Sequence, residues 1–219
     1  MMFNYILSEL PFPRLRTFIQ GGGVPMRKLL LCVPLSLCAV SLLAQDIRIE
    51  KTRTSPVETK FAANGRIRMD LCSAGIDVIG REDDMLRVDA DPTRGNTRVS
   101  IRVFGDRADV RVSDCPNKNY RVTIEVPKSS ALYIRMLAGE LNVQDVVGDK
   151  DVVLHFGELN IDMGKPEDYR YVEASVNSGD LEAGLFNVSK GGLFRSFDHS
   201  GPGKYRVHAH VGAGQLDLR

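Results

Sequence analysis

The chain has 219 residues, of which 43% are hydrophobic, and its 29 basic and 28 acidic residues leave a formal net charge of +1. This length suits one domain of ordinary size and is short for two. Near-neutrality without a lysine-rich run argues against nucleic acid as the main partner and against binding to an anionic membrane surface.

Residues 1–25 show no pattern of a helix or strand. Phe12 lies between two prolines, and Gly21-Gly22-Gly23 precedes Val24-Pro25. Prolines and glycines at this density interrupt regular structure. We therefore interpret residues 1–25 as a mis-assigned N-terminal extension and Met26 as the true start of translation.

Residues 26–44 have the layout of a secretory signal peptide. Met26-Arg27-Lys28 precedes an apolar run that ends at Leu43 and is followed by Ala44. A basic start, a short apolar run and a small residue before a polar segment are typical of such peptides. The run is shorter than the roughly 20 apolar residues that span a membrane. We expect cleavage after Ala44, or alternatively after Ser41, and an exported mature chain in the periplasm or outside the cell, without a membrane span.

Half-buried strands are predicted along the first part of the mature chain. Apolar and polar residues alternate at 47–54, 86–90, 99–103, 110–112 and 120–126. Phe104-Gly105-Asp106-Arg107 predicts a tight hairpin loop between two of these runs. Half-buried strands joined by short turns indicate an antiparallel meander in the N-terminal half.

Two cysteines remain after the predicted signal peptide, Cys72 and Cys115. An even number of cysteines in an oxidising compartment predicts a disulfide between them. Two unpaired thiols are the alternative. Neither cysteine has the spacing of a metal site.

One short pattern occurs five times, around Ala74, Gly139, Gly157, Gly179 and Gly214. The residues three and five positions before each of these, and two and four positions after it, are all apolar. These twenty residues are Met69, Leu71, Ile76, Val78, Ile134, Met136, Leu141, Val143, Val152, Leu154, Leu159, Ile161, Ala174, Val176, Leu181, Ala183, Ala209, Val211, Leu216 and Leu218. Because a strand turns successive side chains to opposite faces, each unit predicts a strand, a corner and a second strand with one buried face.

The units lie near 67–78, 132–143, 150–161, 172–183 and 207–218, with an insertion at 190–204 before the last. Repeats this short cannot bury their apolar face alone and must stack. We therefore predict a single all-β domain at 45–219, a stacked-repeat β-solenoid or β-helix-like fold, with a β-sandwich as the alternative.

A family resemblance supports this fold. The run Leu-Cys-Ser-Ala-Gly-Ile-Asp-Val-Ile-Gly at 71–80, then Met-Leu-Arg-Val-Asp at 85–89, resembles the bacterial putative-adhesin family of exported β-solenoid proteins (head-GIN or adhesin-like domains). The later Gly-(Asp/Glu/Gln)-Leu units resemble it too. The resemblance implies a β-solenoid behind a signal peptide, and no functional residue carries over from it.

Two sets of side chains are weak candidates for metal ligands. Glu140, Glu158 and Asp180 each follow a corner glycine, so stacking would align them as a ladder that could hold Ca²⁺; simple exposure to water is the alternative. His208 and His210 share one strand face and could begin a zinc site, with Asp198 and His199 as the nearest further ligands. We predict neither metal nor another cofactor.

No catalytic motif appears in the sequence. It contains no Gly-x-Ser-x-Gly elbow, no phosphate-binding loop and no Cys–His arrangement beyond the predicted disulfide. Phe186, Phe194, Phe197 and Tyr205 flank or lie inside the insertion and are expected to pack in the core or cap the solenoid, with an exposed apolar patch for a partner as the alternative. We predict a non-catalytic envelope or adhesin-like module that contacts an envelope protein or surface polymer through residues such as Arg135, His155, Asn177 and His210. The alternatives are a glycan-acting hydrolase or lyase and a periplasmic accessory protein with one dedicated partner.

Overall fold

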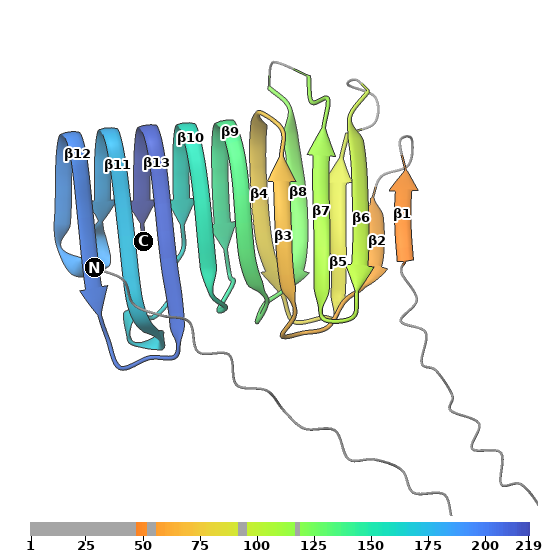
Figure 1. Cartoon of the computed structure of the whole chain (residues 1–219), viewed down its shortest axis with the longest axis horizontal. Helices are drawn as coiled ribbons and strands as arrows, with labels where there is room; N and C mark the ends of the chain where they lie inside the picture. Colours follow the sequence, from red (N-terminus) through yellow and green to blue (C-terminus); the bar gives the residue numbers. More distant parts are fainter. Residues whose placement is uncertain (1–46, 52–55, 92–95, 117–118) are drawn as a thin grey trace, which may run out of the picture. The chain divides into compact units, whose positions relative to one another are not determined.

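A computed structural model describes residues 56–91, 96–116 and 119–219, together with the backbone of 47–51. The predicted extension and signal peptide lie outside these residues. Thirteen strands join in one hydrogen-bonded sheet (Figure 1). They are β1 (Ile47–Lys51), β2 (Val57–Lys60), β3 (Arg66–Leu71), β4 (Ala74–Arg81), β5 (Met85–Ala90), β6 (Arg98–Phe104), β7 (Arg107–Ser113), β8 (Arg121–Pro127), β9 (Ala131–Gln144), β10 (Lys150–Ile161), β11 (Tyr169–Ala183), β12 (Val188–Ser200) and β13 (Tyr205–Leu218).

The only helical elements among the described residues are two 3₁₀ turns, Pro166–Asp168 and Gly184–Phe186. None of the described helical segments has the length and hydropathy needed to cross a bilayer.

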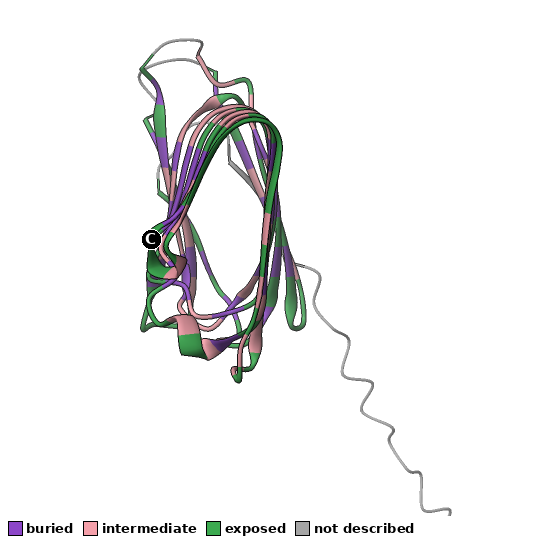
Figure 2. Cartoon of the chain, turned by 90° about the vertical axis from the view of Figure 1, so that its left-hand side faces the viewer, coloured by how far each residue is buried: buried purple, intermediate pink, exposed green. Residues whose placement is uncertain are grey.

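The predicted repeat units form the rungs of a β-solenoid. β9, β10, β11 and β13 are long strands that bend at their corner glycine, and they stack in parallel. β3 and β4 form a fifth rung that is interrupted at the corner. Seen end-on in Figure 2, the rungs superpose as a flattened ring with a shared rounded corner. Because single strands run from one side of this ring to the other, the architecture is a stack of rungs and not a sandwich of two separate sheets.

The core follows the sequence pattern closely. All twenty apolar positions of the repeat point inward and are buried, the most exposed being Leu71 at 8%. The periodicity therefore predicted the buried face of every rung correctly. It did so because a pleated strand with one buried face allows only one register of inward side chains.

Neighbouring rungs approach each other so closely at the corner that only glycine fits there. Gly139, Gly157, Gly214 and Gly179 are aligned across neighbouring rungs, with φ between +130° and +142°. A Cβ on Gly157 would lie 1.9 Å from the carbonyl oxygen of Gly139. Only glycine combines this dihedral angle with this separation at low cost.

The order of the rungs differs from their order in the chain. β13 lies between β10 and β11, so the spatial order is β9, β10, β13, β11, β12. The predicted insertion at 190–204 is largely strand β12, which pairs antiparallel with β11 at the end of the sheet. After β10 the chain thus leaves the neighbouring position in the stack empty and forms the β11–β12 hairpin beyond it. β13 then returns to fill the position between β10 and β11.

The N-terminal half contains the predicted antiparallel pairs, distributed over two faces. β1, β6 and β7 extend the sheet beside β3, and β2, β5 and β8 extend it beside β4. β6 and β7 form a hairpin through the predicted loop at Gly105, where φ is +59°. The successive strands β5 and β6 lie on opposite faces, so the pairing is more complex than a simple meander.

The strands beside β3 and the strands beside β4 form two outer surfaces. The front face is the outer surface of β1, β6, β7 and β3 and of the part of each later rung that precedes its corner. The rear face is the outer surface of β2, β5, β8 and β4 and of the part of each later rung that follows its corner. The predicted disulfide between Cys72 and Cys115 is confirmed, with the two Cα atoms 5.9 Å apart. It ties the corner between β3 and β4 to the segment that follows β7.

Candidate functional site

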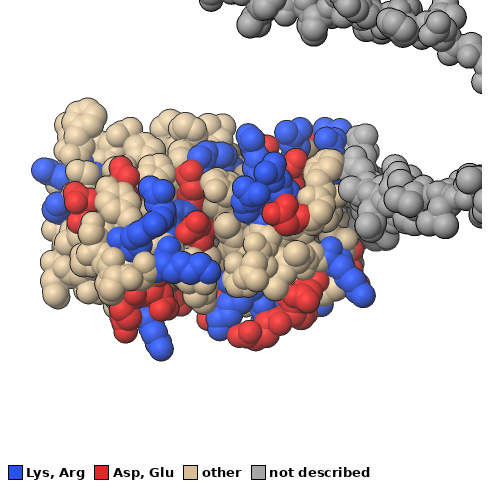
Figure 3. Space-filling view, turned by 60° about the horizontal axis from the view of Figure 1, so that its bottom comes forward, with Lys and Arg blue, Asp and Glu red and all other residues tan. Residues whose placement is uncertain are grey.

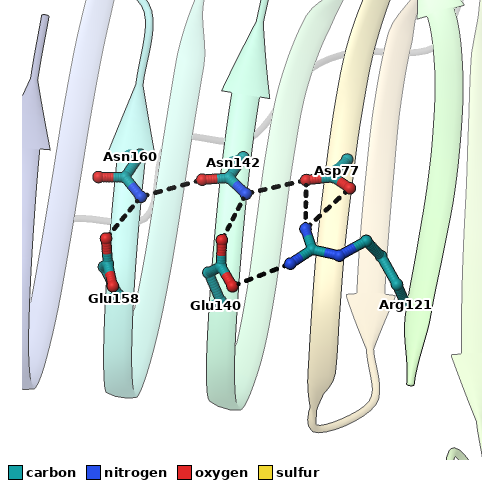
Figure 4. A network of polar contacts seen from close by, with 6 residues as sticks. All are labelled: Asp77, Arg121, Glu140, Asn142, Glu158 and Asn160. Atoms are coloured by element: carbon teal, nitrogen blue, oxygen red, sulfur yellow. Dashed lines mark hydrogen bonds and ion pairs between the residues drawn. The ribbon is translucent and has the colours of Figure 1, made fainter. Parts of the chain in front are cut away.

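A ladder of polar side chains crosses the rear face (Figure 4). The side-chain nitrogen of Asn160 donates to the amide oxygen of Asn142 at 2.9 Å, and that of Asn142 donates to Asp77 at 2.8 Å. Arg121 ends the ladder with two hydrogen bonds to Asp77, both 2.9 Å long. Asn142 and Asn160 are 7% and 6% exposed, so these bonds connect neighbouring rungs in a largely dry environment.

The candidate calcium ligands lie beside this ladder. Glu140 accepts hydrogen bonds from Asn142 and Arg121, and Glu158 accepts one from Asn160. Because β13 lies between β10 and β11, the neutral Gln215 separates Glu158 from Asp180. The expected run of three adjacent carboxylates is therefore interrupted. Among the described residues, no group of three or more His, Cys, Asp or Glu side chains is placed to hold a metal ion.

The two candidate zinc ligands point outward on the front face but have different partners. His208 Nδ1 lies 3.1 Å from a carboxylate oxygen of Asp151, and His210 Nδ1 lies 2.8 Å from the hydroxyl of Ser175. His199 lies on the inner side of β12, where its ring packs on Phe186 with centroids 4.7 Å apart. The structure thus does not bring His199 to the two strand histidines.

The electrostatics of this region favour a neutral imidazole at His210 and an ionised carboxylate at Asp151. Burial, with the nearby His208 and His155, lowers the pKa of His210. Burial opposes ionisation of Asp151, but hydrogen bonds from Arg135 and His208 outweigh it and hold the pKa of this carboxyl below its usual value. A general acid needs the opposite shift, so Asp151 is suited to a structural ion pair.

The most distinctive surface is an arginine-rich part of the front face. Two adjoining hollows, of about 890 and 360 Å³, share Arg68 and Asp109 in their walls. Two acidic side chains, Asp70 and Asp109, line them together with seven arginines. These are Arg66, Arg68, Arg98, Arg102, Arg107, Arg111 and Arg135. In Figure 3, basic side chains gather over the N-terminal strands, on the right of the view.

We refer to these seven side chains as the arginine surface. Four of them form ion pairs: Arg66 with Asp106, Arg98 with Asp114, Arg111 with Asp70 and Arg135 with Asp151, at 2.6–3.5 Å. Arg68, Arg102 and Arg107 are exposed and form no ion pair with any residue that the structure describes. Arg98 donates a hydrogen bond to Asp114, and this bond lowers the pKa of the Asp114 carboxyl.

Sequence reasoning found Arg135 but missed the surface as a whole. The signal was present, because arginines occur at even spacings that put them on one strand face: two apart at 66 and 68, and four apart at 98 and 102 and at 107 and 111. What the sequence did not show is that β3, β7 and β6 are neighbours on one face, while Arg121 of β8 belongs to the other.

The aromatic cluster divides between core and surface. Phe186 and Phe197 pack together with ring centroids 5.1 Å apart, and both, with Tyr205, contact the hydrophobic core. Phe194 is 80% exposed and the adjacent Leu193 is 62% exposed, so the expected core or capping role is wrong for Phe194. The reason is that the outer edge of β12 has no further strand beside it among the described residues.

Comparison with known proteins gives structural likenesses at low sequence identity. The fold is similar to that of a "putative cell adhesion protein" from Clostridium sporogenes, at 12% identity and a TM-score of 0.49, covering 80% of this chain and 99% of the other. A "putative adhesin" from Parabacteroides distasonis gives 12% identity and a TM-score of 0.31 over 80% and 66% of the two chains. One from Parabacteroides merdae gives 10% and 0.23 over 75% and 95%.

No family model and no curated protein matches the chain.

Proposed function

We propose that this protein is a non-catalytic, exported interaction module of the cell envelope, which contacts an envelope protein or surface polymer through the outer faces of its rungs. The observation that carries this proposal is the arginine surface. It is broad, open and cationic, and its hollows contain two carboxylates, of which Asp70 is ion-paired with Arg111. Such a surface suits contact with an extended partner better than the positioning of a reacting bond.

The scaffold is suited to this role. Each rung fixes its outward side chains at strand spacing, about 4.8 Å from the next rung. The buried faces of the rungs are packed and apolar apart from Lys150 of β10, so the outward residues can vary without disturbing the core. The backbone of such a rigid surface is already ordered, so binding carries no entropic cost of ordering the main chain.

The proposal is tested by locating the full-length protein and measuring what it binds. A bacterial host expressing the chain should release it with the periplasmic fraction, and the released protein should begin at Gln45 or at residue 42. This protein should then co-sediment with envelope fragments and leave them chemically unchanged. Retention of the chain in the cytoplasm, or failure to bind any envelope fraction, would contradict the proposal.

The same experiment distinguishes the binding role from the enzymatic alternative. A hydrolase would release reducing ends from envelope polysaccharide, and a lyase would release unsaturated sugars, in proportion to the amount of protein. Either product, if lost on substitution of Asp70 or Asp109, would replace the binding role with a catalytic one.

A specific observation also favours the accessory role with one dedicated partner. Leu193 and Phe194 lie exposed on the edge strand β12, and uncovered apolar side chains of this size are typical of protein contacts. A dedicated partner would be captured as one cross-linked species through a photoreactive residue at position 194. Many weak cross-links would instead support a general envelope contact.

A further inference from the structure

We propose that the arginine surface binds an acidic polysaccharide whose sugars bear carboxylates, with Arg68, Arg102 and Arg107 as the main contacts. This inference rests on the proposed function and names the chemical class of its ligand. It is argued from the charge, pairing and spacing of the outward side chains on β3, β6, β7 and β9.

The charge of the surface is positive. Seven arginines and two aspartates line the two hollows, and three further aspartates, Asp106, Asp114 and Asp151, are ion-paired with these arginines. Seven positive against five negative side chains leave an excess of two positive charges, all on arginine. None of the basic residues lining the hollows is lysine. Arginine presents a planar fork of donors that matches a carboxylate in a bidentate manner, which a lysine ammonium cannot do. The composition therefore favours a ligand with oxyanion groups, such as carboxylates, that accept two parallel hydrogen bonds from one arginine.

The pairing of these arginines is poor by comparison with the rear face. Arg66 and Arg107 occupy directly opposite positions of the parallel pair β3–β7, an arrangement of like charges that destabilises a sheet. On the rear face, by contrast, Arg81, Arg87 and Arg121 are all ion-paired with carboxylates. The same chain thus neutralises the arginines of the rear face, while three of those that line the front-face hollows form no ion pair with the described residues. An anionic ligand would supply the missing partners.

The spacing of the free arginines fits an extended ligand. Arg102 and Arg68 both stand opposite Asp109 of β7, on its two sides, so their strands are separated by about 9.6 Å. Their side chains are exposed and do not converge on a buried point. A polymer with repeated acidic groups would contact several of these exposed side chains at once, which strengthens its binding.

Exposed aromatic rings beside the arginines favour a sugar polymer. Tyr133 is 41% exposed and stands directly opposite Arg68, and Phe104 is 43% exposed opposite Arg107. An exposed ring with apolar faces offers a platform for a sugar ring. Single-stranded nucleic acid is bound by successive aromatic side chains along a groove. Here the two rings lie at opposite sides of the arginine surface, so we favour the polysaccharide.

The test uses the full-length protein and three polymers of known chemistry: polygalacturonate, neutral dextran and oligothymidine. We expect binding to polygalacturonate that weakens as salt rises from 50 to 300 mM, because exposed charges are screened. The triple variant Arg68→Gln, Arg102→Gln, Arg107→Gln should bind at least about tenfold more weakly, corresponding to 1.4 kcal/mol or more.

A matched control removes the same charge elsewhere. Lys60, Lys165 and Arg170 are exposed, lie outside the two hollows and form no ion pair with the described residues. The triple variant Lys60→Gln, Lys165→Gln, Arg170→Gln should bind polygalacturonate within about twofold of the parent. Unchanged melting temperatures would show that both variants fold.

Several results would overturn this inference. Equal losses in the two triple variants would show a non-specific effect of net charge, and tighter binding of oligothymidine would identify a nucleic-acid surface. If the protein binds envelope fragments but not polygalacturonate, the ligand class is wrong while the proposed function stands. If it binds no envelope material, the proposed function itself fails.

Discussion

The Nζ atom of Lys150 lies 2.7 Å from the hydroxyl oxygen of Tyr169, and both side chains are buried inside the solenoid. Lys150 also lies 3.3 Å from the carbonyl oxygen of Gly148, and its Nζ is 4.9 Å from the centre of the Tyr169 ring. Burial lowers the pKa of Lys150 to about 7, although Asp162, Asp149 and Asp168 oppose the shift. Burial likewise raises the pKa of Tyr169. A lysine in this position makes stability depend on pH.

We predict that Lys150→Met stabilises the protein, and more so at low pH. The unfolded chain holds the lysine proton up to a pKa near 10.5, while the folded chain loses it near 7. The folded state therefore binds fewer protons between these values, and the stability of the parent rises with pH across this window. At pH 6 Lys150 is charged in the folded and the unfolded chain, and burial of this charge lowers the free energy of unfolding by on the order of 3–5 kcal/mol. Urea unfolding from pH 6 to 9.5 measures the difference.

The expected signature is a gap between parent and Lys150→Met that narrows as pH rises from 7 to 9.5. Lys165→Met, at an exposed lysine, serves as the control and should show no such trend. A gap that is constant across this range would show that Lys150 is not neutral in the fold.

Substitution of a corner glycine should destabilise the stack. Gly157→Ala places a Cβ against the carbonyl of Gly139 at a φ of +130°, so we expect a loss of about 2–4 kcal/mol in the free energy of unfolding. Gly184→Ala is the matched control, since no atom lies within 4 Å of its Cβ position. Thermal unfolding compares the two, and similar melting temperatures would show that the corners tolerate a side chain.

Lys150 also shows where the sequence was informative and where it was not. Seven positions before each corner stand Ile67, Leu132, Lys150, Val172 and Val207, so the buried lysine occupies an otherwise apolar column. Extending the repeat alignment by two residues would have revealed it. The buried face was predictable because inward alternation is a strong local pattern.

The order of the rungs was not predictable in the same way. β13 and β11 have the same inward pattern and the same corner, so exchanging their positions leaves each buried column with the same residues. One consequence is that Gln215, and not Asp180, stands beside Glu158. The arginine surface was hidden for a related reason, since it depends on which strands are neighbours.

Removal of the disulfide should lower stability without changing the fold. Cys72 and Cys115 are 43 residues apart in sequence, and opening a loop of this size costs about 2–4 kcal/mol. We expect the double variant Cys72→Ser, Cys115→Ser to unfold at lower urea concentration, and reduction of the parent to have the same effect. A parent whose urea midpoint is unchanged by reductant would indicate that the bond contributes little.

The polar ladder of the rear face should act as one unit. Asn142→Leu removes two hydrogen bonds to carboxylates and the acceptor of Asn160, so we expect a loss of about 1–3 kcal/mol. Asn177→Leu, at an exposed asparagine, should cost less than about 0.5 kcal/mol. Because Asn160 donates directly to Asn142, the double variant Asn142→Leu, Asn160→Leu should be less destabilised than the sum of the single variants. Strict additivity would instead mean that each rung holds its own polar pair, and that the bond between the two asparagines adds nothing to the stacking of the solenoid.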